Sequence, residues 1–376
     1  MNNKSKKDNV KMSYKRPVAL VLVCAMLLAV SIFTGCTKYE YAIELKDGGK
    51  TVGGIDQKLM SLIMSVSNSQ MGVDAYAGTN IWNTPYPGSD KTIKDIVVAQ
   101  TKAYAKGLLQ AEYLCDKVYG IGLTDEQTAL VDTCIEDMKN LYGGKKGLES
   151  ILSTYGTDIE SLSRYMLLVI KQKIVYEALY SVDTGIRYSE IQKNKESYFE
   201  NNFLVEDHIL LKYSGGIKAD GTEIPLTQEE KLKKLETAKT LYAEIENGVR
   251  TFDDALKEFG EDTYILGYPF GYFVMKDADM GSLSHDVQNA VREMEVGEIK
   301  FVETNEGAYI VRRNPMSPEL YKSNGNFELQ LESMVVQEDF LTLCENAATV
   351  NVNDEIINGL DPENIPSFNM SLLGQE

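Results

Sequence analysis

The spacing of apolar residues changes twice along this 376-residue chain, and the change limits the folds that the chain can adopt. From about residue 55 to 202 the apolar residues recur every three or four positions, as on one face of an amphipathic helix. Residues 203–314 mix such stretches with short strand-like runs, and a helical pattern returns within residues 315–376. The sequence therefore predicts an α+β protein, in which a mainly helical domain is interrupted by a small inserted domain and then resumed.

Two segments that begin with Thr give the clearest helix starts in the first region. Thr124-Asp125-Glu126-Gln127 and Thr157-Asp158-Ile159-Glu160 have the form of a capping box, in which the Thr oxygen accepts from a backbone N–H of the first turn. The apolar stripe behind the first start is expected at Leu130, Cys134, Met138 and Leu141. Residues 71–90 are rich in Gly, Asn and Pro and contain the only Trp, so we expect a long loop there.

The inserted region has the order strand, two helices, loop, helix and two strands. A strand is predicted from Val205 to Tyr213, and a long helix begins after Thr227 and ends at Gly248. The remaining elements are a helix from Thr251, an aromatic loop from Gly267 to Phe273, a helix over 284–294, and strands over 299–303 and 308–312. Asn305-Glu306-Gly307 is a hairpin turn signal between the last two strands. We therefore expect a small antiparallel sheet with helices around it.

The N-terminus has the features of an export signal. Basic residues precede an apolar run from Val18 to Phe33, which ends in Thr34-Gly35-Cys36. A transmembrane anchor is the alternative interpretation, but the run is shorter than the roughly 20 apolar residues that span a bilayer. Residues 33–36 resemble a bacterial lipobox, which implies removal of residues 1–35 and a diacylglyceryl anchor on Cys36. Residues 36–54 are then predicted to be a linker.

Charge and cysteine content exclude several classes of function. The net charge of −18 disfavours nucleic acid as a partner, because affinity for phosphate backbones comes from clustered Lys and Arg. Outside the signal and Cys36, the cysteines are Cys115, Cys134 and Cys344, and an odd number argues against a disulfide framework. A bridge between Cys115 and Cys134 stays open, since they lie on successive predicted helices. No cysteine or histidine cluster indicates a metal site, and no phosphate-binding loop is present.

Three segments of the inserted region resemble the parvulin-type peptidyl-prolyl isomerase family. They are Glu206-Asp207-His208-Ile209-Leu210-Leu211, Phe252-Asp253-Asp254-Ala255-Leu256 and Val296-Gly297-Glu298-Ile299. The chain outside this region is similar to exported foldase lipoproteins of the PrsA type, whose helical domain also resembles that of SurA. The similarity lies in segments 82–83, 91–95 and 120–126. The resemblance implies a membrane-tethered, extracytoplasmic chaperone that acts on unfolded or newly exported proteins with X-Pro bonds and needs no cofactor.

The resemblance also assigns candidate catalytic residues. Prolyl isomerisation must lower a rotation barrier of about 18–20 kcal/mol without breaking a bond, so a site needs hydrogen-bonding groups that favour the twisted amide. His208 matches the first of two family histidines, and Asp262 matches a position that holds Cys or Asp. Thr304 matches a hydroxyl of the same network. The second histidine is replaced by Tyr309, which implies weaker catalysis or none.

The pocket for the proline ring is assigned in the same way. Leu283, Val287 and either Val291 or Arg292 stand where the family has Met, Phe and Phe, so the pocket is expected to be shallower. Phe273 belongs to an aromatic loop with Tyr264, Tyr268, Phe270 and Tyr272. Two interpretations of this loop stay open, since its rings could contact a bound peptide or pack in a core.

These patterns leave three functions to compare. The leading hypothesis is a lipid-anchored foldase with prolyl isomerase activity, and the alternative is a non-catalytic holdase with a degenerate parvulin-like domain. A solute receptor of a transporter is also exported as a lipoprotein, but its fold requires repeated βαβ units that the long helical stretch does not supply. A homodimer is left open by the sequence.

Overall fold

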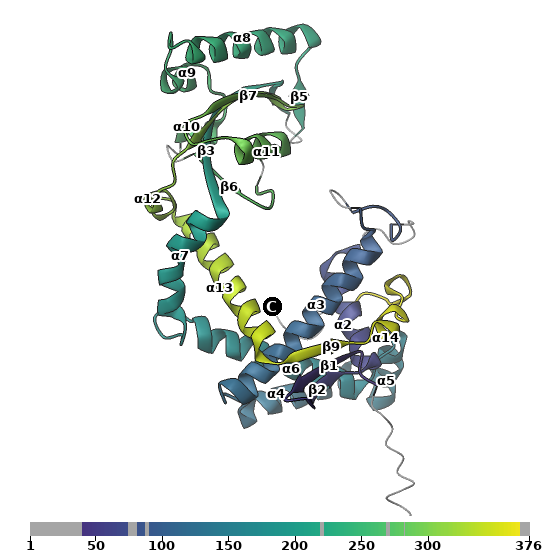
Figure 1. Cartoon of the computed structure of the whole chain (residues 1–376). Coiled ribbons are helices and arrows are strands. Elements are labelled where there is room, and N and C mark those ends of the chain that lie inside the picture. Colours follow the sequence, from purple (N-terminus) through teal and green to yellow (C-terminus); the bar gives the residue numbers. More distant parts are fainter. Residues whose placement is uncertain are drawn as a thin grey trace, which may run out of the picture. The chain divides into compact units, whose positions relative to one another are not determined.

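The computed structural model describes residues 40–73, 81–86, 90–218, 222–267, 271–281 and 283–368, which fall into two compact units. The first unit comprises Met1–Val175 and Leu343–Glu376, and the second comprises Tyr176–Thr342. The two boundaries fall within the long helices α6 (Ile159–Tyr180) and α13 (Gly325–Ala347) (Figure 1). The predicted export signal and Cys36 lie outside the described residues.

Helices make up most of the first unit, as the sequence predicts. They are α2 (Gln57–Gln70), α3 (Ile93–Tyr113), the π-helix η2 (Leu114–Val118), α4 (Asp125–Leu141), α5 (Lys145–Thr154), the first part of α6, and near the C-terminus α14 (Asp354–Asn358) and the short helix η3 (Pro362–Asn364). The predicted capping box at Thr124 and Gln127 is confirmed. A second box, formed by Thr92 and Asp95, begins α3.

The predicted capping box at Thr157 is wrong by one residue. The N–H of Ser161 donates to Oδ1 of Asp158 at 2.8 Å, so Asp158 caps α6. The hydroxyl of Thr157 is buried and has no hydrogen-bond partner. Asp158 is also held by Lys58, whose Nζ lies 2.7 Å from Oδ2 of Asp158. The ion pair with a residue distant in sequence fixes the carboxylate at the helix start, which local sequence does not reveal.

The buried face of α4 is also shifted from the predicted stripe. Val131, Ile135 and Met138 face the core, whereas Leu130 and Leu141 are 60% and 67% exposed. The stripe through Leu130 and the one through Val131 both have helical spacing, so periodicity alone does not choose between them. Packing against the rest of the core makes that choice.

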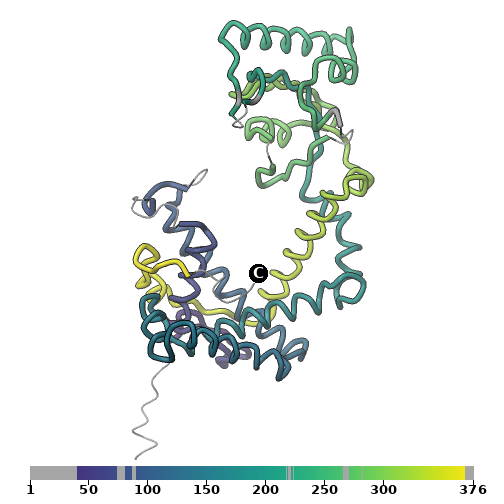
Figure 2. Tube along the Cα trace, turned by 180° about the vertical axis from the view of Figure 1, so that it is seen from behind, coloured from purple at the N-terminus to yellow at the C-terminus, as the bar shows by residue number. Residues whose placement is uncertain are grey.

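A three-stranded sheet occupies the segment that we predicted to be a linker. Strands β1 (Ile43–Asp47) and β2 (Lys50–Ile55) form a hairpin, and β9 (Thr349–Val352) pairs with β1 on its other side. Figure 2 shows this meeting of the purple N-terminal and yellow C-terminal segments. The linker prediction fails because the third strand comes from the other end of the chain and is invisible to a local pattern.

The second unit contains a four-stranded antiparallel sheet with helices on both faces. Its elements are α7 (Tyr188–Asn202), β3 (Phe203–Lys212), β4 (Ser214–Ile217), β5 (Glu223–Pro225), α8 (Gln228–Glu246), α9 (Phe252–Phe259), α10 (Thr263–Gly267), β6 (Tyr272–Met275), α11 (His285–Glu293), β7 (Ile299–Glu303), β8 (Gly307–Asn314) and α12 (Pro318–Lys322). The strand order is β6-β3-β8-β7. Helices α8 and α9 cover one face and α11 covers the other (Figure 1).

The α+β class is confirmed. The structure also contains the predicted strands β3, β7 and β8 and the predicted helices α8, α9 and α11. Three strands of the second unit were missed. β6 lies at the end of the predicted aromatic loop, and β4 and β5 form a separate hairpin. Each of the strand pairs in the described residues is antiparallel, so the repeated βαβ units of a solute receptor are not found there.

An aromatic cluster joins α7 and α13 to the sheet and explains why the second unit is longer than residues 203–314. It contains Phe199, Phe203, Phe273, Tyr321 and Phe327. The rings of Phe273 and Phe327 stack with centroids 3.8 Å apart. Ion pairs add to this contact, since Nζ of Lys195 on α7 lies 2.9 Å from Glu328 and 3.2 Å from Glu332 on α13. The flanking helices therefore belong to the same core as the sheet.

Two further predictions can be compared with the described residues. Cys115, Cys134 and Cys344 form no disulfide, so the Cys115–Cys134 bridge is absent in this structure. In the described part of the chain, no helix has both the length and the apolar character needed to cross a bilayer.

Candidate functional site

A buried acid and a buried base lie on one face of the central strand β3. Side chains alternate along a strand, so Glu206 and His208 share a face with the apolar Leu204 and Leu210. Both polar side chains are 0% exposed. Because an unpaired charge or polar group is costly to bury, each needs a partner within the protein.

His208 is held between two carboxylates. Its Nδ1 lies 3.1 Å from Oε1 and 3.3 Å from Oε2 of Glu206, and its Nε2 lies 3.1 Å from Oδ2 of Asp262. Asp262 comes from the loop between α9 and α10. Its Oδ1 accepts the backbone N–H of Tyr264 at 2.8 Å, and its Oδ2 accepts the hydroxyl of Tyr272 on β6 at 3.0 Å. The structure therefore brings His208 and Asp262 together, as the resemblance implies.

The carboxylates decide the protonation state of the histidine. Burial alone lowers the pKa of His208, but the adjacent charges of Glu206 and Asp262 outweigh it and raise the pKa to about 9. Burial raises the pKa of Asp262, but its hydrogen bonds from His208 and from the N–H of Tyr264 lower it to about 2. At neutral pH the ring nitrogen Nε2 thus carries a proton that it donates to an ionised Asp262.

Glu206 is coupled to the other side of the ring. Burial raises the pKa of Glu206, although the nearby His208 opposes that shift. Because the pKa of His208 is raised to about 9, Nδ1 also carries a proton at neutral pH, which it donates to Glu206. The set of His208, Glu206 and Asp262 then bears one net negative charge rather than two, which limits the cost of burial.

Two tyrosine rings enclose the imidazole. Tyr272 stacks on His208 with ring centroids 5.4 Å apart, and Tyr309 on β8 meets it edge-on at 5.1 Å. The hydroxyl of Tyr309 donates to Oε2 of Glu306 at 3.2 Å. Burial raises the pKa values of both tyrosines, so both keep their protons at neutral pH. Tyr309 therefore contacts His208 through its ring and directs its hydroxyl to the β7–β8 turn.

Thr304 does not join the network to which the resemblance assigned it. Its hydroxyl oxygen accepts the backbone N–H groups of Glu306 at 3.1 Å and Gly307 at 3.3 Å, and its O–H donates to the carbonyl of Gly307 at 3.2 Å. A Thr at such a position caps its own turn. These local bonds occupy the hydroxyl, so Thr304 shapes the hairpin.

Three of the predicted pocket residues lie together, and the fourth does not. Leu283, Val287 and Val291 form one buried cluster with Tyr309 beneath α11. Phe273 lies instead in the aromatic cluster with Phe327. The difference follows from the alternation of β6, because Tyr272 and Val274 face α11 and Phe273 faces away. The alternative pocket residue, Arg292, donates to the carbonyl of Met275 at 3.0 Å.

The aromatic loop is divided in the same way. Tyr264 and Tyr272 pack together with ring centroids 4.7 Å apart next to Asp262, whereas Phe273 is a core residue. Tyr268 and Phe270 lie outside the described residues.

Sequence reasoning missed Glu206 and the role of Tyr272. A signal for Glu206 was available, because an acid two positions before a His on an otherwise apolar strand face must lie beside it. The signal for Tyr272 was weaker, since it required recognition of β6 as a strand.

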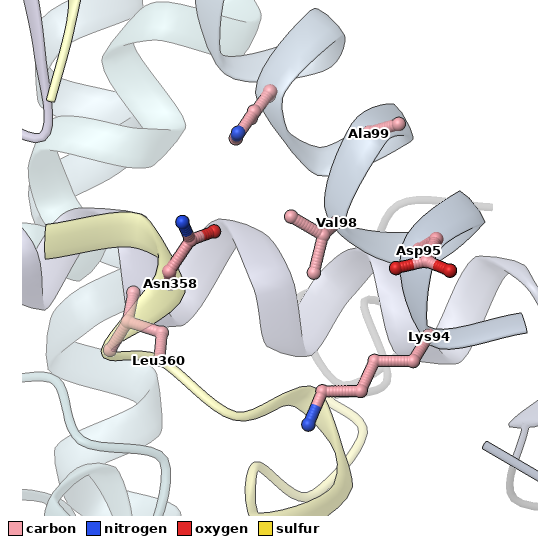
Figure 3. Close-up of a pocket in the computed structure, with 7 residues that line it drawn as sticks. Lys94, Asp95, Val98, Ala99, Asn358 and Leu360 are labelled. Carbon is pink, nitrogen blue, oxygen red and sulfur yellow. The ribbon is translucent and has the colours of Figure 1, made fainter. Parts of the chain in front are cut away.

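A separate hollow of about 380 Å³ lies in the first unit between α3 and the C-terminal segment (Figure 3). Val98, Ala99 and Leu360 give it apolar walls. Two lysines also line it, and both are paired: Lys94 lies 2.8 Å from Asp361, and Lys102 contacts Asp354. This arrangement suggests a structural role for its charges. In the described ranges, no group of three or more His, Cys, Asp or Glu side chains is arranged to hold a metal ion.

Comparisons with known proteins bear on the second unit. The family model of the PPIC-type PPIASE domain matches residues 190–314, which run from within α7 to the end of β8. No curated protein sequence matches the chain. Among solved structures, the peptidylprolyl isomerase PrsA from Bacillus cereus is 16% identical, with 79% of this chain and 100% of that chain covered and a TM-score of 0.25.

Two other solved structures have comparable values. The foldase protein PrsA from Streptococcus pneumoniae is 16% identical, with 73% of this chain and 92% of that chain covered and a TM-score of 0.23. A SurA-like chaperone of Campylobacter jejuni is 16% identical, with 72% and 99% covered and a TM-score of 0.18.

Proposed function

We propose that this chain, whose residues 190–314 belong to the PPIC-type peptidyl-prolyl isomerase family, is an extracytoplasmic foldase that assists the folding of exported proteins. The observation that carries the proposal is the family match over the segment that contains the hydrogen-bonded pair His208 and Asp262. The lipobox-like segment before Cys36 supports a lipid anchor on the outer face of the membrane.

The proposed chemistry uses the groups around His208. Twisting an X-Pro amide removes its resonance, and polar groups placed for the twisted form lower the barrier without forming a covalent bond. His208, Asp262 and Tyr309 form the floor of the proposed site, and Leu283, Val287 and Val291 receive the proline ring. These three side chains are at most 8% exposed, so the pocket is closed in this structure and must open to receive the ring.

A non-catalytic holdase is the second candidate, and a specific observation favours it. The hydroxyl of Tyr309 is bonded to Glu306, so it does not supply the second hydrogen-bonding group that the family histidine provides. On this account the domain binds extended segments of unfolded clients through its surface, and their folding is not accelerated.

Refolding of an unfolded protein whose slow phase is limited by prolyl isomerisation tests the two candidates. A foldase shortens that phase at substoichiometric concentration, and the His208→Gln variant does not. A holdase suppresses aggregation of the same client equally well with and without His208, and leaves the slow phase unchanged. The anchor is tested separately, because Cys36→Ser should abolish incorporation of labelled fatty acid into the protein.

A further inference from the structure

Glu206 is a buried carboxylate. The family resemblance assigns no role to it. Its side chain is 0% exposed, and both of its oxygens lie within 3.3 Å of Nδ1 of His208. Ionisable side chains are rarely buried unless they are paired. Its place beside the candidate catalytic histidine therefore requires an explanation.

The backbone around Glu206 is fixed from both sides. On one side it pairs with Tyr272 of β6, and on the other it pairs with Arg313 of β8. Gly271, the residue before β6, lies very close to this backbone, because an added Cβ would be 2.1 Å from the carbonyl oxygen of Glu206. The position of the Glu206 side chain is thus set by the centre of the sheet.

Fixing Glu206 also fixes the ring of His208. A hydrogen bond to one nitrogen of an imidazole determines which nitrogen is protonated and how the ring is oriented. With Glu206 at Nδ1, Nε2 faces Asp262 and must carry a proton, because an unprotonated nitrogen there would repel the carboxylate. Without Glu206, the ring is free to lose a proton or to turn.

We propose that Glu206 is a positioning residue of this site, which holds His208 in the orientation and protonation state in which Nε2–H donates to Asp262. This inference rests on the proposed function for its importance in catalysis. The titratable groups that face His208 are Glu206 on β3, Asp262 before α10, Tyr272 on β6 and Tyr309 on β8. Helix α11 packs on the same face through apolar residues.

The histidine resonances give a direct test, because the chain has only two histidines. In the purified protein labelled with ¹⁵N-histidine, the ring nitrogens of His208 and His285 are followed by NMR as the pH is changed. We expect His208 of the parent to stay doubly protonated through neutral pH. In Glu206→Gln its titration midpoint should fall by about one unit or more.

A matched control is Asp207→Asn, which removes a carboxylate from the adjacent position on the opposite face of β3. Asp207 pairs with Arg312, and Arg312 keeps Asp253 as a second partner at 2.9 Å when Asp207 is changed. This variant should leave the titration of His208 unchanged. An unchanged midpoint in Glu206→Gln, or an equal shift in Asp207→Asn, would overturn the proposal.

A measurement on the parent protein covers the case in which Glu206→Gln does not fold. The Nδ1 proton of His208 should exchange slowly with solvent and resonate far downfield, as expected for a buried hydrogen bond to a carboxylate. Its absence would overturn the role of Glu206. Neither NMR result depends on turnover, so a parent protein that fails to catalyse isomerisation would refute the proposed function and leave the positioning role to be judged by NMR.

Discussion

The free energy of unfolding of the second unit should decrease as the pH rises from 6.5 to about 9. His208 binds its proton more tightly in the folded protein, where the two carboxylates raise its pKa from 6.5 to about 9. Folding therefore gains stability from this proton below pH 6.5, and the gain is lost as the pH rises through about 9. Each unit of pKa difference corresponds to about 1.4 kcal/mol, so this histidine should contribute about 3 kcal/mol.

Urea unfolding at pH 6.5 and pH 9 measures this change. Circular dichroism reports both units, whereas the fluorescence of Trp82, the only Trp, reports the first unit. The loss of stability should therefore appear in the unfolding transition of the second unit, which circular dichroism detects and Trp82 fluorescence does not. The pH-dependent loss of stability should disappear in His208→Gln and persist in His285→Gln, which removes the other histidine. An equal pH dependence in the parent and in His208→Gln would refute the reasoning.

Two further predictions concern backbone and capping positions. Gly271→Ala should destabilise the second unit by more than about 2 kcal/mol, because the residue has φ +78° and its new Cβ would meet the carbonyl of Glu206. A smaller loss of unfolding free energy in urea would contradict the close approach. Asp158→Ala should destabilise the first unit by about 1 kcal/mol through loss of the α6 cap, whereas Thr157→Val should stabilise it by about 1 kcal/mol, because it removes a buried hydroxyl without a partner. Unfolding followed by Trp82 fluorescence measures both changes. If Thr157→Val destabilises the unit and Asp158→Ala does not, Thr157 is the cap.

The elements that could be predicted from the sequence are those with strong local signals. Thr227 and Glu230 form the capping box that begins α8, and Gly248 follows its end with φ +68°. The turn at Asn305-Glu306-Gly307 joins β7 and β8 as its composition indicates. In these cases the local chain contains the groups that satisfy its own backbone, so no distant contact is needed.

The elements that were missed depend on distant partners. β6 is a four-residue edge strand, and its identity follows from its pairing with β3, far away in the sequence. The hairpin of β1 and β2 is completed by β9 from the C-terminal segment. Short strands have too few residues for a periodicity of two to stand out, and tertiary pairing then decides.

The candidate site was predicted in part for the same reason. His208 and Asp262 were assigned through family resemblance, and the structure places them in contact. Phe273 was misplaced because, without β6, the side to which it points could not be known. Thr304 was misplaced because its own turn satisfies its hydroxyl.

The rate of cis-to-trans exchange in a short peptide with one Ala-Pro bond tests the central claim most directly. Magnetisation-exchange NMR with catalytic amounts of the purified protein measures that rate without any contribution from chaperone activity. We predict that the parent accelerates the exchange and that His208→Gln and Asp262→Asn each abolish most of the acceleration. Exchange at the uncatalysed rate with the parent protein, or acceleration that persists in both variants, would contradict an isomerase site at His208.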